Sequence, residues 1–388
     1  MLGKYFDYNA TTPLREEVAS IVCEGLTLFG NPSSTHTFGQ ITRKKIEIAR
    51  EQVANLIGAN SSEIVFTSGG TESINTVFKS ICVKNEQTIH IITSQIEHSA
   101  TLEVCSYLAS QGIEVSYLPV DSNGIISIDD LKQAIRHNTV LVSLMYANNE
   151  TGTLQAIQSM AIEARKIKKD IFFHVDAVQA VGKVPINVKD LEIDALSMSS
   201  HKLYGPKGIG ALYLKDQNHL PTQLIHGGGQ EFGIRGGTEN VIGIIGFGEA
   251  CRIAETDLFE EYNRTLKLKK YFLEKMNDFN EDFIINGAIE DDKCLPNTIN
   301  IAFLNVRAEA LAAMLSEIYG IAVSIGAACS SEKVKLSHVL LALGLSEERV
   351  KSSIRISFGH YTDYEDINYL VDNLIKTVKQ LRSMLPVV

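Results

Sequence analysis

Short apolar runs and amphipathic stretches alternate through the first two thirds of the chain. Residues 39–57 carry apolar side chains three and four positions apart and stop at Gly58, which predicts an amphipathic helix. Six apolar runs predict buried strands, at residues 63–67, 89–93, 140–146, 171–175, 195–199 and 209–214. Near-continuous apolar strands separated by helical stretches are typical of an α/β fold with a mostly parallel sheet covered on both faces.

The pattern changes after about residue 258 and indicates a second, smaller α+β domain. The segments expected there are a charged helix, a strand and two more helices, at 262–277, 298–303, 308–318 and 364–384. We therefore assign residues 15–258 to a large domain. Residues 1–14 and 259–388 are assigned to a small domain, which carries a loop at about 323–334.

Composition excludes several classes of protein. The chain has 388 residues, 45% hydrophobic and 21% charged, and a net charge of 36 − 46 = −10, without a basic stripe that would favour direct binding to nucleic acid. No apolar stretch approaches the ~20 residues of a membrane span, and the N-terminus lacks a signal-peptide pattern. The six cysteines are scattered, at positions 23, 82, 105, 251, 294 and 329. We expect neither disulfides nor a metal site, and a cytoplasmic location.

Polar residues follow the predicted strands at the sheet edge where ligands of this fold class bind. The glycine turn S-G-G-T-E-S (68–73) opens a helix and is a candidate phosphate site, while His98, Asp176 and Lys202 follow other strands. Each has an ordinary alternative: a structural turn, a structural histidine, a salt-bridged aspartate and a lysine that reaches solvent. Together, however, a lysine nucleophile, a buried carboxylate and a phosphate cup match the needs of pyridoxal 5'-phosphate.

The chain resembles the pyridoxal-phosphate-dependent cysteine desulfurases over about residues 5–360. The motifs that carry this resemblance are F-D-Y-N-A-T-T-P (6–13), G-N-P-S-S-T-H (30–36), T-S-G-G-T-E-S (67–73), A-N-N-E-T-G (147–152), H-V-D-A-V-Q (174–179), S-S-H-K-L-Y-G-P-K-G-I-G (199–210), H-G-G-G-Q-E (226–231) and R-G-G-T-E-N (235–240). The resemblance implies the aspartate-aminotransferase-like fold, type I, and a homodimer with active sites near the subunit interface.

The resemblance also implies roles for individual residues. Lys202 would form the Schiff base with the cofactor and then move protons, and His98 would stack on the cofactor ring and serve as a second catalytic residue that moves protons. Asp176 would pair with the ring nitrogen, and Gln179 would hydrogen-bond the ring hydroxyl. The implied phosphate ligands are Gly70, Thr71, Ser199, His201 and, from the other subunit, Thr238. The implied ligands of the substrate carboxylate are Asn149, Arg355 and Asn31, and Asn149 is also assigned to the cofactor site.

Cys329, in S-I-G-A-A-C-S-S, resembles the nucleophile of the long-loop group of these enzymes. It would take sulfur from L-cysteine as a persulfide, release L-alanine, and pass the sulfur to an acceptor protein. Small neighbouring side chains predict a mobile tether at about residues 325–334. Three positions depart from the family's common residues: Gly70, where alanine is common, and Gly236 and Ala327, where serine is common.

Several alternatives share most of these features. Selenocysteine lyases, kynureninase-like hydrolases and small-substrate aminotransferases could share Asp176, His98 and Lys202 but do not need Cys329. A non-catalytic scaffold that keeps the cofactor for stability would tolerate the loss of Lys202 or Cys329, and both are present. Iron–sulfur cluster assembly is the default destination of the sulfur by family frequency, with tRNA thiolation and DNA phosphorothioation as further possibilities.

Overall fold

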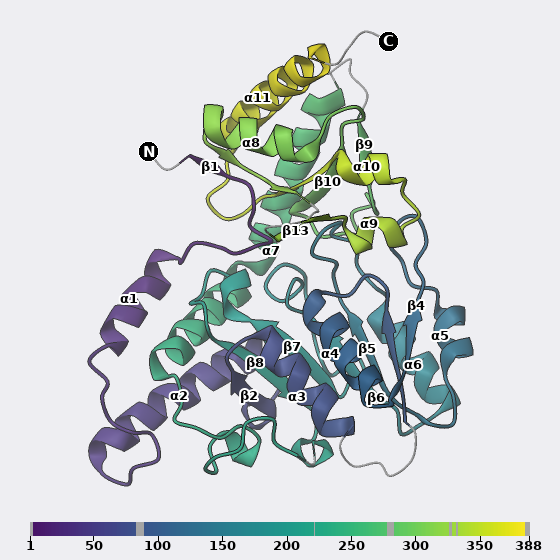
Figure 1. The fold of residues 1–388 in the computed structure, drawn as a ribbon. Helices are drawn as coiled ribbons and strands as arrows, with labels where there is room; N and C mark the ends of the chain where they lie inside the picture. Colours follow the sequence, from purple (N-terminus) through teal and green to yellow (C-terminus); the bar gives the residue numbers. More distant parts are fainter. Residues whose placement is uncertain are drawn as a thin grey trace.

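A large central sheet and a smaller one form the framework of the protein (Figure 1). The structure is a computed structural model that describes residues 3–82, 89–220, 222–277, 283–325, 328–330 and 333–384, with backbone alone for 328–330 and 333–335. Within those ranges, no helix combines the length and apolar character that crossing a membrane requires.

The central sheet has seven strands in the spatial order β2-β8-β7-β6-β5-β3-β4. Their bounds are Ile64–Thr67 (β2), His90–Ser94 (β3), Glu114–Leu118 (β4), Thr139–Met145 (β5), Phe172–Asp176 (β6), Ala195–Ser199 (β7) and Gly210–Leu214 (β8). Neighbouring strands pair in parallel from β7 through β6, β5 and β3 to β4. Strand β8 runs antiparallel to its neighbours β2 and β7. The six predicted strands and the α/β class are confirmed, whereas β4 went unpredicted because this edge strand is only partly buried.

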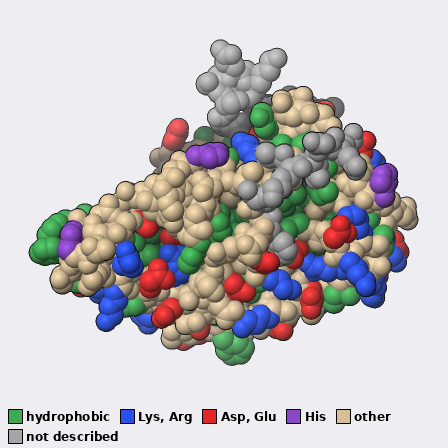
Figure 2. Space-filling view, turned by 90° about the horizontal axis from the view of Figure 1, so that it is seen from below, with side chains coloured by type: hydrophobic (Ala, Val, Ile, Leu, Met, Phe, Trp, Pro, Cys, Tyr) green, Lys and Arg blue, Asp and Glu red, His purple; other side chains and the backbone are tan. Residues whose placement is uncertain are grey.

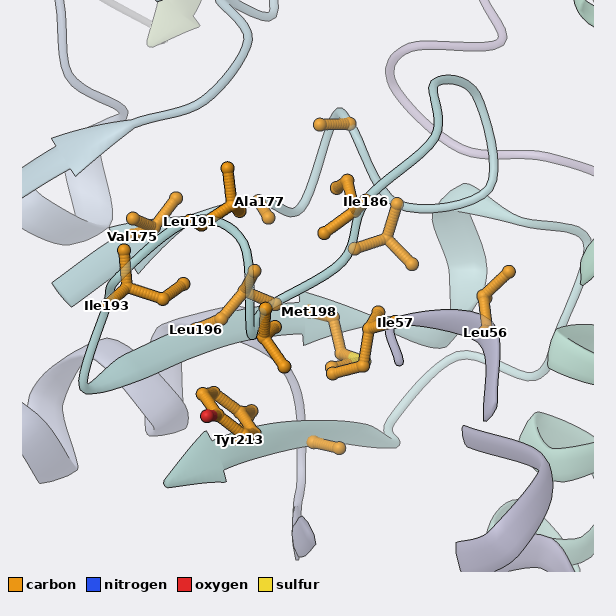
Figure 3. Packing of buried hydrophobic residues seen from close by; sticks show 14 of the residues in the cluster. Leu56, Ile57, Val175, Ala177, Ile186, Leu191, Ile193, Leu196, Met198 and Tyr213 are labelled. Carbon is orange, nitrogen blue, oxygen red and sulfur yellow. The ribbon is translucent and has the colours of Figure 1, made fainter. Parts of the chain in front are cut away.

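Helices cover both faces of the sheet, which explains why its strands are apolar at consecutive positions. The main ones are α2 (Thr37–Leu56), α3 (Gly70–Cys82), α4 (Ser99–Ser110), α5 (Ile128–Ala134) and α6 (Ile157–Ile167), with α1 (Glu16–Gly25) at the side. In β5, Leu141 packs in the core beneath α3 and α4, while its neighbour Val142 packs in the core that includes α2 and α6. Figure 3 shows the second of these cores, where Leu196 and Met198 of β7 lie beside Tyr213 of β8.

A separate hydrophobic core belongs to a four-stranded antiparallel sheet, in the order β12-β15-β10-β9. Its strands are Ile284–Asn286 (β9), Thr298–Ala302 (β10), Ser324–Ile325 (β12) and Ser353–Ser357 (β15). The helices α8 (Ala308–Tyr319) and α11 (Tyr364–Ser383) contribute to this core, and short elements complete the region: β11 (Ile321–Ala322), β13 (Ala328–Ser330), β14 (Lys333–Lys335), α9 (His338–Ala342) and α10 (Glu347–Lys351).

The helix predicted at 262–277 is the second half of a much longer one, α7 (Val241–Asn277). Phe247 and Cys251 in its first half belong to the core of the large sheet, and Leu268 and Phe272 belong to the core of the small sheet. The predicted boundary after residue 258 therefore falls inside a continuous helix that joins the two cores. The first turns of α7, which are rich in glycine and isoleucine, do not show the charged periodicity on which the prediction was based.

The N-terminal segment joins the small sheet and then enters the space between the two cores. Its strand β1 (Lys4–Tyr5) pairs in parallel with β11, Phe6 lies in the smaller core, and Asp7 forms a bridge with Ser357 of β15. The residues that follow, from Tyr8 onward, reach the carboxyl edge of the central sheet. There, Thr12 donates a backbone hydrogen bond to the His201 carbonyl oxygen (3.0 Å).

Basic and acidic side chains are interspersed on the face of the molecule that Figure 2 displays. This mixture agrees with the even distribution of charge along the sequence, although the net charge is negative. A face of this kind lacks the single-sign field that draws a protein to a polyanion.

Candidate active site

A cleft lies at the carboxyl ends of the central strands and encloses about 1000 Å³ of space, including its open mouth. It is lined by Asn9, Ala10, Gly70, Thr71, Ile74, His98, Ala100, Met145, Ala147, Asn149, Asp176, Val178, Gln179, Ser199, His201, Lys202 and Arg355. Ten of the residues predicted for the site therefore meet in one cavity. Nine of them come from the ends of five strands of the central sheet and the segments that follow those strands, and Arg355 comes from β15 of the small sheet.

Lys202 lies directly after β7, in the short 3-10 turn Ser200–Lys202, and is half-buried. Its Nζ donates hydrogen bonds to the carbonyl oxygens of Asn9 (2.6 Å) and Ala10 (2.8 Å). Burial and the nearby positive charge of Arg355 lower the pKa of Lys202 to about 8, against the opposing effect of Asp7 and Asp176. At neutral pH this amine therefore loses its proton far more readily than an ordinary lysine, as a nucleophile or base must.

Asp176 ends β6 with 6% of its surface exposed and accepts a hydrogen bond at Oδ1 from the Val178 amide (3.0 Å). Burial raises its pKa, and no ion pair to Asp176 exists among the described residues. A buried carboxylate that faces a cavity without a cationic partner is costly. The N–H of a protonated pyridine ring would supply that partner, so Asp176 fits the cofactor that the sequence predicts.

His98 caps the N-terminus of α4 at the mouth of the cleft. Its Nδ1 accepts a hydrogen bond from the Ala100 amide (3.2 Å), which leaves the hydrogen of the neutral ring on Nε2. The surrounding protein lowers the pKa of His98, and the charges of Lys202 and His338 lower it further, against the effect of Asp176. The ring is therefore neutral at pH 7 and can stack on an aromatic cofactor while it offers an Nε2 hydrogen.

The turn before α3 provides the predicted phosphate site. Gly70 and Thr71 begin the helix, so their backbone N–H groups and the helix dipole favour an anion. Ser199 and His201 face the same cavity from the end of β7. Burial and three nearby lysines lower the pKa of His201 to about 4, so it contributes a hydrogen bond there and no positive charge.

Two of the departures from the family pattern have a packing explanation. A Cβ added at Gly70 would lie 2.6 Å from Cγ2 of Val178, a branched side chain with little freedom to move. A Cβ added at Gly236 would lie 2.6 Å from the backbone of Gly227. These glycines therefore permit close approaches inside the loops that carry the site. Ala327, the third departure, lies outside the described residues.

Arg355 projects from β15, and Asn149 from the A-N-N-E-T-G turn lies beside it. Its guanidinium donates to the Asp7 carboxylate (2.6 Å) and to the Asn149 carbonyl oxygen (3.0 Å), while its buried Nε has no hydrogen-bond partner among the described residues. Only 8% of Arg355 is exposed. The remaining donors of this rigid, permanently charged group suit a substrate carboxylate.

Three predicted residues are not part of the cleft as the single chain forms it. Asn31 lies on an exposed turn where its Oδ1 accepts a hydrogen bond from the Ser33 amide (2.9 Å). Thr238 is exposed, and its neighbours Gly237 and Glu239 line a different pocket. The backbone of Cys329 lies in β13, opposite Val334 of β14, but its side chain is outside what the structure describes. Within the predicted mobile tether at 325–334, residues 326–327 and 331–332 lie outside the described residues, and only the backbone is described for 328–330 and 333–334.

Asn9 was not predicted, although it lies in the quoted motif F-D-Y-N-A-T-T-P. Its carbonyl oxygen accepts from Lys202 and from Gln179 Nε2 (2.9 Å), and its Oδ1 accepts from Lys183 Nζ (3.3 Å). Lys183 also donates to Gln179 Oε1 (2.7 Å), which leaves the second Nε2 hydrogen of Gln179 for a ligand. Asn9 therefore fixes both the lysine and the glutamine of the site. No apolar pattern precedes it, so local sequence gave no signal.

The Asn9 side chain also connects the site to the small sheet. Its Nδ2 donates to Thr298 Oγ1 of β10 (2.9 Å) and to the Asn149 carbonyl oxygen (3.2 Å), and its amide donates to Ser357 Oγ of β15 (3.0 Å). Because Asn9 is 1% exposed, these bonds form away from water and constrain its position strongly.

Glu97, directly before His98, is a second unpredicted residue. Its Oε1 accepts from Ser94 Oγ (2.6 Å) and the Met145 amide (3.0 Å), while its buried Oε2 has no partner in the part of the chain that the structure describes. Burial raises the pKa of Glu97 to about 8, and the nearby Asp176 acts in the same direction. The carboxyl group is therefore largely protonated at neutral pH and clamps the ends of β3 and β5 beside the site.

We expect Glu97→Gln to remove a pH dependence of stability. Between the unfolded pKa of about 4.5 and the folded value of about 8, the folded protein keeps a proton that the unfolded chain has released. The free energy of unfolding of the parent chain therefore falls across this window as pH rises. Glutamine has no such titration, so Glu97→Gln should become more stable relative to the parent as the pH rises toward 8. The difference in the free energy of unfolding should exceed about 1 kcal/mol there.

Urea unfolding of both cofactor-loaded proteins between about pH 5 and pH 8 measures this difference. Glu103→Gln, an exposed position on α4, is the control and should follow the parent at every pH. Parallel stability curves for Glu97→Gln and the parent would show that Glu97 does not hold a proton in the folded state.

Comparisons with known proteins agree with the geometry of this site. The model of the family "Aminotransferase class-V" matches residues 4–370. The chain is 47% identical over 384 residues to a protein of Dictyoglomus turgidum named cysteine desulfurase IscS, which covers 98% of this chain and 96% of that protein.

Solved structures share the fold. A NifS-like protein superposes with a TM-score of 0.90 at 37% identity, covering 99% of this chain and all of that chain. A structure described as SspA in complex with cysteine superposes with a TM-score of 0.81 at 39% identity, covering 93% of this chain and all of that one.

Proposed function

The chain belongs to the aminotransferase class-V family and is a pyridoxal-phosphate-dependent cysteine desulfurase, and from this premise we propose that Lys202, His98 and Cys329 are its reacting groups. The superposition on the NifS-like protein also confirms the predicted type I fold. The observation that carries the proposal is the convergence on one cleft of a lysine of lowered pKa, a neutral histidine and a buried aspartate that has no ion pair among the described residues.

The cofactor would be held on three sides of the cleft. Asp176 would bind the N–H of its ring, Gln179 would bind the ring hydroxyl, and the N-terminus of α3 with Thr71, Ser199 and His201 would hold its phosphate. When bound, pyridoxal phosphate supplies an electron sink that acidifies the hydrogen on the substrate's α-carbon and weakens its C–S bond. The contacts of Asp176 and the helix terminus support this orientation.

Lys202 removes the α-hydrogen of L-cysteine at Nζ and returns it later in the reaction. The carbonyl oxygens of Asn9 and Ala10 accept hydrogen bonds from Nζ, so they stabilise the ammonium form after it has taken the proton. Arg355 and Asn149 orient the substrate through its carboxylate, with Asn31 as a further candidate. Because Arg355 is anchored by Asp7, the carboxylate meets a fixed donor.

The Cys329 thiolate attacks the substrate's sulfur atom. A new S–S bond forms as the substrate's C–S bond breaks, which leaves a persulfide on Cys329 and the carbon skeleton of L-alanine. The thiol must lose its proton first, because the thiolate is the nucleophile. We assign Cys329 this role from its sequence context, S-I-G-A-A-C-S-S.

The acceptor of the sulfur is, by this proposal, a protein that assembles iron–sulfur clusters. The name of the relative in Dictyoglomus turgidum supports a desulfurase of this type. Transfer of labelled sulfur from Cys329 to a cluster scaffold, compared with transfer to tRNA-thiolation or DNA-phosphorothioation enzymes, distinguishes the three destinations. All five cysteines with described side chains are free thiols, which supports a reducing, cytoplasmic location.

Cys329→Ser should retain the absorbance of bound cofactor and lose sulfide release from L-cysteine by at least about 100-fold, because a hydroxyl is a far weaker nucleophile toward sulfur. Absorption spectra and a sulfide assay with a thiol reductant measure the two effects. Cys23→Ser, which changes an exposed cysteine on α1, should leave both unchanged. Sulfide release near the parent rate in Cys329→Ser would rule out Cys329 as the nucleophile.

Lys202→Ala should lose covalent attachment of the cofactor. Borohydride reduction followed by intact mass measurement should find the cofactor fixed to the parent chain but not to the variant. The exposed Lys207→Ala, five residues along the same loop, is the matched control and should behave as the parent. Attachment to Lys202→Ala at the parent level would mean that another lysine carries the cofactor.

We also propose a homodimer in which Thr238 of one chain completes the phosphate site of the other. Support comes from the position of Thr238, which is exposed and outside the cleft of its own chain. Light scattering should give twice the chain mass of 42.7 kDa. Thr238→Ala should remain dimeric and bind the cofactor about 10-fold more weakly, because a hydrogen bond to a charged group contributes about 1.5 kcal/mol or more. A monomer with unchanged cofactor affinity would refute this arrangement.

A further inference from the structure

A buried lysine and a buried cysteine are in contact at the junction of the two hydrophobic cores. Lys269 of α7 has 5% of its surface exposed, and Cys294 has 1%. Lys269 Nζ lies 2.9 Å from Cys294 Sγ and 3.1 Å from the Leu295 carbonyl oxygen. No carboxylate forms an ion pair with Lys269 within the part of the chain that the structure describes.

This contact brings two nucleophiles together in a site that the desulfurase reaction does not use. A buried lysine is normally paired with a carboxylate; here its partner is a thiol, and both side chains are enclosed. The other buried cysteines differ, because neither Cys105 nor Cys251 has a hydrogen bond to a lysine among the described contacts.

We propose that Lys269 and Cys294 form an oxidation site at which peroxide creates a covalent bond between Sγ and Nζ. In the first step, the thiol sulfur is oxidised to a sulfenic acid, and hydrogen peroxide is reduced to water. In the second, the Nζ lone pair attacks Sγ, the sulfenic hydroxyl leaves as water with a proton from the amine, and a sulfenamide forms. The net change is the loss of two hydrogens, by the same chemistry that joins a sulfenic acid to a backbone nitrogen.

Hydrogen peroxide has a short path to this site. The turn that precedes Cys294 is exposed at every position from residue 289 to residue 293, and Cys294 is the first buried residue after it. A local opening of one turn would therefore expose the thiol without unfolding either core. The flexible stem of Lys269 allows Nζ to close the remaining distance to Sγ.

The bond would link α7 to a segment that leads into the active site. Residues 293–295 pair with residues 152–154, since Leu295 donates to the Gly152 carbonyl oxygen (2.8 Å) and Leu154 to the Lys293 carbonyl oxygen (2.9 Å). The Asn149 turn ends at Gly152. In the other direction, the chain continues to Thr298, which holds the Asn9 side chain. The oxidation site thus lies where α7 contacts a segment that connects with both the Asn149 turn and Thr298.

Peptide mapping of oxidised holoenzyme tests the proposal. Cofactor-loaded Cys329→Ser protein, used so that the proposed nucleophile does not react, is treated with stoichiometric hydrogen peroxide, quenched with catalase and digested. We expect a cross-linked peptide that joins Lys269 to Cys294, with two hydrogens fewer than the sum of its parts, and its disappearance after dithiothreitol. In the same background, Lys269→Arg keeps a donor but lacks the amine, so it should give oxidised Cys294 without the link.

Thermal unfolding gives a second readout that does not depend on catalysis. Because the bond closes a loop between residues 269 and 294, the oxidised protein should unfold at a temperature about 2 °C or more above the reduced protein. Cys294→Ser should show no such shift, and Cys251→Ser, at an equally buried position of α7, should keep it. Unreacted Cys294, or a sulfinic acid at Cys294 beside a free Lys269, would overturn the proposal. Neither result would affect the assignment of Lys202 and Cys329.

Discussion

The hydrogen bonds of Asn9 are the constraint on which the active site depends. One backbone carbonyl oxygen accepts from Lys202 and Gln179, while the side-chain amide of the same residue bonds to Thr298 of the small sheet. Lys202 lies in the turn that follows β7 of the large sheet. Its position relative to Arg355 therefore depends on a segment that belongs to neither the large sheet nor its helices. The N-terminal strand β1, paired with β11, anchors that segment in the small sheet.

Most of the titratable side chains in and beside the cleft are shifted toward their neutral forms instead of being held in ion pairs. Burial lowers the pKa values of Lys202 and His201, and burial raises that of Glu97. Lys183, behind Gln179, follows the same rule, since burial lowers its pKa well below the usual value. Arg355 cannot lose its charge in this way, and of these four basic groups it alone is paired with a carboxylate, Asp7, within the described residues. The site thus keeps one permanent cation for the substrate carboxylate.

The sequence predicted the strands and turns that carry the site residues better than it predicted the hydrogen bonds that position them. Asp176, His98 and Lys202 follow apolar runs, and a buried strand ending in a polar residue can be read from local pattern. Asn9 follows no such run, and its partners lie 140 to 348 positions away in the chain, so only tertiary structure reveals it. Glu97 was missed because its importance comes from complete burial, which an isolated acidic residue in a sequence does not indicate. The length of α7 was missed because its two halves pack in different cores and carry different patterns.

The continuity of α7 has a mechanical consequence for the two cores. A single helix that contributes Phe247 to one core and Phe272 to the other resists bending, because a bend would break its backbone hydrogen bonds. Relative movement of the two cores must therefore occur where α7 contacts loops, as it does at Leu295, whose carbonyl oxygen accepts from Lys269. From Leu295 the chain reaches Thr298 and its bond to Asn9 within three residues. A shift between the cores would therefore move the Asn9 carbonyl oxygen, which accepts a hydrogen bond from Lys202. The geometry of the catalytic amine thus depends on the packing of α7, although α7 does not line the cleft.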